Sequence, residues 1–184
     1  MNQENVEWKS INEILIPGQK QTLKKSQLKG DGKYPVINSG RTLYGKFNSY
    51  NNDDEIITFA SRGEYAGFVS YFNEKVFCGG LCYPYKVKNK KDLNIKYVFY
   101  YLKSNEQRIM NEIVIEGSIP ALNKIDIEKF KIPIPPFETQ NKIVNILDKF
   151  SNIIKDIKNG IPKEIELTRK QYLYYRNKLL SFRE

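Results

Sequence analysis

The chain has 184 residues, a formal net charge of +9 at pH 7 and no histidine. The lack of histidine excludes Ser-His-Asp and Cys-His nucleophiles, HExxH metal sites and a histidine general base, while the positive charge favours a polyanion as the partner. No run of about 18 apolar residues occurs, and the N-terminus lacks the basic-then-apolar order of a secretory signal, so we expect a cytoplasmic protein with no membrane segment.

Short segments with β-branched and aromatic residues alternate with turn residues over the first 136 positions. They predict strands at 55–60, 67–72 and 82–87, with weaker candidates at 34–37 and 131–134. Pro84, in the third segment, indicates an edge strand or a bulge. Apolar residues at helical spacing between 94 and 113 predict a helix with one buried face. The predicted fold class is therefore α+β, with one or two helices packed on short strands.

Two glycine-framed loops carry polar side chains suited to reading base edges. In the first loop, at 39–46, Arg41 would contact guanine and Tyr44 would stack or contact a sugar, although an ordinary hairpin turn explains the same residues. In the second, at 61–65, Arg62 and Glu64 would read a G·C pair, or would instead pair with each other. The candidate DNA contacts in these loops are Ser39, Arg41, Thr42, Tyr44, Lys46, Ser61, Arg62, Glu64 and Tyr65.

Two lysine-rich runs, at 20–33 and 86–91, are further candidates for phosphate contact. In the first run the candidate contacts are Lys20, Lys24 and Lys25. A solvated face explains both runs equally simply and is the preferred interpretation of the second. Cys78 and Cys82 are interpreted as buried, small apolar residues, because a zinc site would need two further ligands.

The tail that follows the proline-rich stretch at 132–136 has the periodicity of a coiled coil. Its apolar or aromatic positions recur at spacings of four and three, with one break of two consecutive fours at 159–162, where Gly160 and Pro162 favour a helix end and a helix start. We therefore expect two helices, or one kinked helix, at about 138–158 and 162–182, each roughly 32 Å long. The seam positions are Ile143, Leu147, Phe150, Ile154, Ile157, Ile161, Ile165, Tyr172, Tyr175 and Leu179.

This seam needs a cover, and three covers are open: self-closure as a two-helix hairpin, docking on the helices of a partner, or a second copy. A self-closed hairpin of this size is marginal by itself, so we favour a homodimer or a partner's helices, with the ten seam positions as the interface.

The C-terminal half contains several distinctive motifs: GSIPAL at 117–122, FKIPIPPFETQ at 130–140 followed by 143–147, GIPKEI at 160–165, RKQY at 169–172 and YRNKLL at 175–180. These motifs resemble the type I restriction-modification specificity (S) subunit family, and Trp8 with segments 39–45 and 61–67 matches its looser upstream pattern. The resemblance implies a target recognition domain at 1–136 and a helical, coiled-coil-like spacer and dimerisation region at 137–184.

The resemblance also implies the partners: double-stranded DNA, methyltransferase subunits that hold S-adenosylmethionine, and an ATP-driven restriction subunit as a further candidate. No cofactor is then expected in this chain. Members of the family usually carry two recognition domains, whereas this chain has one, so it looks like a half-subunit. Two copies related by a two-fold axis would read a bipartite palindrome. A truncated product, or one domain of a longer parent, would look the same.

No catalytic motif stands out. Residues 134–137 lack the Asn or Asp of the methyltransferase Asn/Asp-Pro-Pro-aromatic motif, and neither G-x-G-x-x-G nor a P-loop occurs. The carboxylates at 53–55 would suit Mg²⁺, but they lack the lysine of a restriction-nuclease motif and are typical of a solvated turn. We expect a non-catalytic, sequence-specific recognition subunit; the alternatives are a helical adaptor that binds the methyltransferase without selective DNA reading, and a small nuclease.

Overall fold

A four-stranded antiparallel sheet forms the centre of the globular part. The computed structural model describes residues 6–157 and 162–181, with side chains described except at 155–157 and 162–165. The strand order of the central sheet is β2 (Leu15–Pro17), β8 (Cys82–Val87), β5 (Ile56–Ala60) and β6 (Val69–Phe72). The predictions for 55–60, 67–72 and 82–87 are confirmed within two residues.

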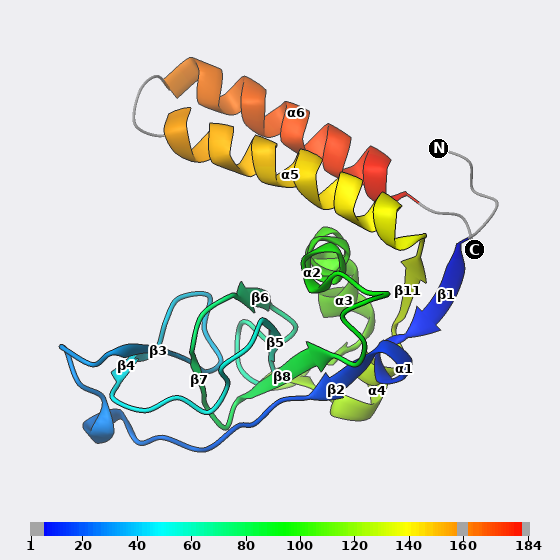
Figure 1. The fold of residues 1–184 in the computed structure, drawn as a ribbon. Coiled ribbons are helices and arrows are strands. Elements are labelled where there is room, and N and C mark those ends of the chain that lie inside the picture. Colours follow the sequence, from blue (N-terminus) through cyan, green and yellow to red (C-terminus); the bar gives the residue numbers. More distant parts are fainter. Residues whose placement is uncertain (1–5, 158–161, 182–184) are drawn as a thin grey trace.

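Smaller sheets flank the central one. A three-stranded sheet has the order β4 (Gly45–Phe47), β3 (Tyr34–Ile37) and β7 (Phe77–Cys78). Two ladders pair β1 (Glu7–Ser10) with β11 (Lys131–Ile134), and β9 (Val114–Ile115) with β10 (Ala121–Leu122). The three-stranded sheet and the β1–β11 ladder lie at opposite ends of the globular part (Figure 1).

The helices are short in the globular part and long in the tail. The short ones are α1 (Ile11–Ile14), the 3₁₀ turn η1 (Lys25–Gln27), α2 (Ile95–Ser104), α3 (Glu106–Glu112) and α4 (Lys124–Glu128). The tail contains α5 (Phe137–Ile157) and α6 (Pro162–Leu180). In Figure 1, α2 lies between the central sheet and the two tail helices. None of the described helices combines the length and apolar character that crossing a membrane requires.

Pro84 lies in an interior strand, so the prediction of an edge strand or a bulge is wrong. Strand β8 pairs with β2 on one side and in regular register with β5 on the other. The carbonyl of Pro84 accepts a hydrogen bond from the N–H of Gly18, one residue beyond the end of β2. Because the N–H and C=O of one residue in an antiparallel strand point to the same neighbour, the donor that proline lacks falls where the β2 ladder ends.

The helix predicted over 94–113 is divided in two at Asn105. The side chain of Asn94 caps the start of α2 by accepting hydrogen bonds from Lys96 N and Tyr97 N. At the other end, the Asn105 side chain donates to the carbonyl of Tyr101, and its backbone leaves helical geometry before α3 begins. The asparagine therefore satisfies a carbonyl at the end of α2, and a second, separate helix follows it.

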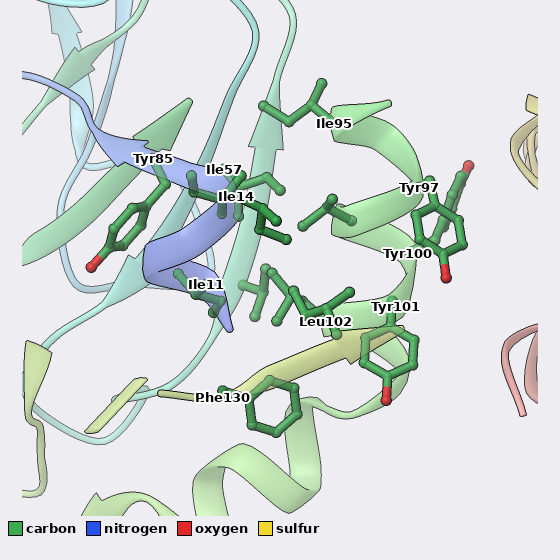
Figure 2. Packing of buried hydrophobic residues seen from close by; sticks show 14 of the residues in the cluster. Ile11, Ile14, Ile57, Tyr85, Ile95, Tyr97, Tyr100, Tyr101, Leu102 and Phe130 are labelled. Atoms are coloured by element: carbon green, nitrogen blue, oxygen red, sulfur yellow. The ribbon is translucent and has the colours of Figure 1, made fainter. Parts of the chain in front are cut away.

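A single apolar core joins the central sheet to α2 and to the tail. Figure 2 shows Ile57 and Tyr85 of the sheet and Ile11 and Ile14 of α1 facing Leu102 of α2. The core continues into α5, whose Ile143, Val144 and Leu147 are buried, and into Leu180 of α6. The boundary expected at 136/137 coincides with the start of α5, yet both sides of it share this core.

The tail helices form an antiparallel hairpin, and Phe150 of α5 stacks on Tyr175 of α6 with ring centroids 5.3 Å apart. The preference for a second chain as the cover of the seam is wrong for Ile143 and Leu147, because both side chains are fully buried within this chain. Tyr172 and Leu179 also pack against the core. Pro162 begins α6 as expected. Residue Ile161 and the side chains of Ile157 and Ile165 lie outside the described residues.

Candidate nucleic-acid interface

The two loops singled out in the sequence meet in space. The guanidinium carbon of Arg41 lies 4.9 Å from the ring centroid of Tyr65 and 5.6 Å from that of Phe68. Within such distances a cation is attracted to the ring face. Arg41 is exposed and forms no ion pair among the described residues, so its guanidinium is held in place by the rings while its N–H donors stay available.

The first loop connects the antiparallel strands β3 and β4, so it is a hairpin connection, as one of the two interpretations expected. Its far end is fixed by a hydrogen bond from Tyr44 N to Val36 O, 2.7 Å long. Its near end is fixed through Asn38, whose side chain accepts from Leu81 N at 2.8 Å. A Cβ at Gly79 would lie only 2.5 Å from that side-chain oxygen, so glycine is needed there for the close approach.

The candidate contacts of the first loop differ in accessibility. Thr42 and Lys46 are exposed, Tyr44 is 37% exposed, and Ser39 is half-buried. Together with Arg41 they form a polar edge on the β3–β4 hairpin.

The second loop connects β5 to β6 and is pinned on two sides. Its Gly63 and Gly67 have φ of +91° and +89°, a region that favours glycine. Ser61 is buried at 8% exposure, because its backbone pairs with Leu81 and Leu122. The prediction that Ser61 contacts DNA is therefore wrong.

Arg62 and Glu64 remain the accessible polar side chains of the second loop. Both are exposed, and no ion pair joins them in the part of the chain that the structure describes, so the expectation that they pair with each other is not met. Tyr65 is half-buried under Arg41.

A third segment, missed from the sequence, lies against the second loop. The β9–β10 hairpin bridges Arg62 through Ala121, and the N–H of Gly63 donates to the carbonyl of Pro120 at 2.8 Å. Ile115 and Ile119 are 58% and 59% exposed at this hairpin. The available signal was the GSIP turn between two short apolar segments, but its pairing partner lies more than 50 residues away in the sequence.

The lysines of the first run lie in two places. Lys20 donates to Gly80 O at 3.2 Å and lies 4.6 Å from the centroid of Tyr83, whereas Lys24 and Lys25 are exposed at the start of η1. The segment after η1 runs beside β4, since Lys29 N donates to Lys46 O at 2.9 Å.

The second lysine run faces the carboxylates at 53–55. Lys90 binds Asp54 at 2.5 Å and holds the pKa of that carboxyl below its usual range, mainly through their hydrogen bond. Lys86 lies 3.5 Å from Asp53, and Glu55 accepts a hydrogen bond from Tyr71. These groups form surface ion pairs, and the described residues contain no group of three or more His, Cys, Asp or Glu placed to hold a metal ion.

Cys78 and Cys82 are buried free thiols, as expected. Their mutual hydrogen bond, with burial, raises the pKa of Cys78 above its ordinary value, and Cys82 donates to Gly79 O at 3.3 Å. Both thiols are therefore held as small, uncharged core groups.

Comparison with known proteins relates the chain to one family. Residues 3–167 match the family model described as the type I restriction modification DNA specificity domain. The chain is 37% identical over 154 residues to the putative type I specificity subunit S.MpnORF285P of Mycoplasma pneumoniae, covering 82% of this chain and 49% of that protein. It is 29% identical over 196 residues to the type I restriction enzyme EcoR124I/EcoR124II specificity subunit of Escherichia coli, covering 96% and 48%.

Solved structures have the same fold. The crystal structure of a type I restriction-modification S subunit from M. genitalium superimposes with a TM-score of 0.74 at 22% identity, covering 84% of this chain and 41% of that one. An HsdS subunit from Thermoanaerobacter tengcongensis gives 0.62 at 17%, covering 95% and 44%. The chain thus spans about half the length of the relatives that it matches.

Proposed function

The chain belongs to the type I restriction modification DNA specificity domain family, and we propose that it acts as a sequence-specific DNA-recognition subunit that directs methyltransferase subunits, and a restriction subunit where one is present, to a bipartite site. The catalytic steps then belong to those partners. The relatives whose names describe them as type I specificity subunits support this assignment.

The observation that carries the proposal is the meeting of the two loops at Arg41 and Tyr65. A reading surface needs donors and acceptors held in a fixed direction, because a bidentate contact to a base edge tolerates little displacement. Arg41 is fixed by two rings, and Arg62 is fixed by the backbone bridge to β10. Glu64, on the same loop, adds an acceptor for the amine of cytosine.

Affinity and selectivity then come from different residues. Lys24, Lys25 and Lys46 lie on exposed positions beside the first loop and would neutralise phosphates without reading sequence. Arg41, Arg62 and Glu64 would discriminate between bases. This division makes the two contributions separable by experiment, because only the first depends strongly on salt.

The decisive test is sequencing of the methylated genome in cells that carry this chain with its methyltransferase subunit, compared with cells that lack the chain. We expect modified adenines or cytosines at one bipartite palindrome that disappears without the chain. Methylation that requires the chain but shows no preferred sequence would contradict the proposal and would support the adaptor alternative.

The palindrome follows from a proposed homodimer. After the hairpin closes on itself, its outer side still has an apolar hollow lined by Ile146, Phe150, Tyr175 and Leu179. Ile146 is 37% and Tyr175 42% exposed, and Ile153 on the same helix is 46% exposed. A second copy would cover this face and supply the half that full-length relatives contain.

Sedimentation equilibrium of the purified chain at micromolar concentration tests the dimer. We expect particles of twice the 21.6 kDa chain mass, and single chains after Ile146→Asp, which places a charge in the hollow. Ile125→Asp is the matched control, because Ile125 is 61% exposed on α4, away from the hairpin. A wild-type chain that is strictly monomeric would contradict this part of the proposal.

A further inference from the structure

A groove of about 490 Å³ lies where the globular part meets the helical hairpin. Tyr71 of β6 and Lys103 of α2 line its globular side, and Ser151 of α5 and Tyr172 of α6 line its hairpin side. Strand β6 is the edge of the central sheet, so the groove begins beside the β5–β6 loop that carries Arg62 and Tyr65.

Lys103 links this groove to the recognition loops. Its ammonium group lies 3.7 Å from the centroid of Phe68, the ring that Arg41 also contacts. The same group donates to Val69 O at 3.1 Å and to Glu106 at 2.6 Å. An ammonium group has three N–H donors, so one remains for a further acceptor.

Arg176 lies on the opposite side of the groove. Its guanidinium carbon is 5.9 Å from the ring centroid of Tyr172, which lines the groove, and its N–H groups donate to Asn177 at 3.2 and 3.3 Å. No carboxylate pairs with it among the described residues. Burial lowers the pKa of Lys103, and both Arg41 and Arg176 are close enough to lower it further.

The charges at the two ends of the groove differ. At one end, Lys96 is neutralised by Asp148, with their charged atoms 2.6 Å apart. At the other end, three cations, Arg41, Lys103 and Arg176, are opposed by the single carboxylate of Glu106. This end therefore has excess positive charge beside partly desolvated rings, where an anion interacts more strongly than in open water.

We propose that Lys103 and Arg176 bind a backbone phosphate of the DNA strand whose bases are read by Arg41, so that the duplex crosses from the recognition loops onto α6. The inference rests on the proposed function. A phosphodiester fits because guanidinium and ammonium groups bind its oxygens through charge-assisted hydrogen bonds. The hairpin then contacts DNA directly, and it orients the recognition loops on the duplex as well as spacing them.

The test is the salt dependence of binding of the full chain to a random-sequence DNA duplex, measured by fluorescence anisotropy. Arg176→Gln should reduce the slope of log K against log salt by about 0.9, the value for one lost phosphate contact. Lys149→Gln removes an exposed charge from α5 that does not line the groove and should leave the slope unchanged. Arg176→Lys keeps the charge and should restore the slope.

Because this measurement needs no preferred site, its outcome is separate from that of the proposed function. A wild-type chain with a clear salt slope but no preferred sequence would overturn the proposed function, and the variants would still decide the phosphate contact. An Arg176→Gln variant with the wild-type slope, folded by circular dichroism, would overturn the inference. Arg176→Gln should also keep the sequence preference, since a phosphate contact does not read bases.

Discussion

The side-chain oxygen of Gln140 accepts a hydrogen bond from the backbone N–H of Asn94, 2.9 Å away, and thereby ties the first turn of α5 to the start of α2. The amide nitrogen of Gln140 donates to Asp92 O and Pro135 O at 3.0 and 2.9 Å, and the side chain is fully buried. One residue thus satisfies three backbone groups at the junction between the globular part and the hairpin.

Replacing Gln140 by alanine should leave three buried backbone groups without partners. The expected loss is about 1–3 kcal/mol or more in the free energy of unfolding, since each buried unpaired group carries its own desolvation cost. Urea denaturation followed by circular dichroism measures it. Gln107→Ala is the control, because Gln107 is exposed and pairs only with Asn111; equal losses in the two variants would contradict this role of Gln140.

Leu147→Ala tests whether α5 is packed on its own chain or requires another. Leu147 is fully buried in the shared core, so its truncation should cost about 2–5 kcal/mol in the isolated chain. Ile153→Ala, on the same helix but 46% exposed, should change the free energy of unfolding by much less. If Leu147→Ala were as mild as Ile153→Ala, the hairpin would not be packed as described.

The sequence predicted local structure better than pairing. Strands β3, β8 and β11 have the expected bounds, and α5 and α6 begin within a residue of their predicted starts, because these segments have clear periodicity and Pro162 marks a start. Asn105 was missed as a helix boundary, since its effect depends on one hydrogen bond to Tyr101.

The candidate site was only partly predictable, for a related reason. Exposed polar residues in glycine-framed loops pointed to Arg41 and Arg62, yet nothing local indicated that Arg41 stacks on Tyr65 or that Ser61 is buried. Periodicity likewise marked Ile143 as apolar without showing that this chain's own α2 and core would cover it. Contacts between distant segments depend on the assembled fold.

Alkaline pH should unfold the protein through its buried tyrosines. Burial raises the pKa of Tyr71, Tyr85, Tyr97 and Tyr100 well above the ordinary value of 10.0. Above pH 10 the unfolded chain loses these protons while the folded chain keeps them, so the unfolded state binds fewer protons and stability falls as pH rises. The stability that these groups contribute is therefore fully present below about pH 10 and lost above it.

Tyrosinate absorbance and circular dichroism, followed together in an alkaline titration, check this expectation. Part of the tyrosinate signal should appear only in the cooperative unfolding step. Tyr97→Phe should reduce that part, although it also removes the hydrogen bond from Tyr97 to Pro133 O. Complete ionisation before any unfolding would contradict the expectation.

Substitutions of Arg41 and Arg62 should each relax selectivity at one base position. Arg41→Ala removes a fixed bidentate donor, so binding of a reconstituted complex to its preferred duplex should weaken by about 1–3 kcal/mol, and only at the base that Arg41 reads. Competition against duplexes with single base-pair changes measures this. Lys149→Ala is the control for lost charge, since it is exposed on α5. If Arg41→Ala and Arg62→Ala both left site selectivity unchanged, the two loops would not be the reading surface, and the third segment at Ile115 and Ile119 would be the next to test.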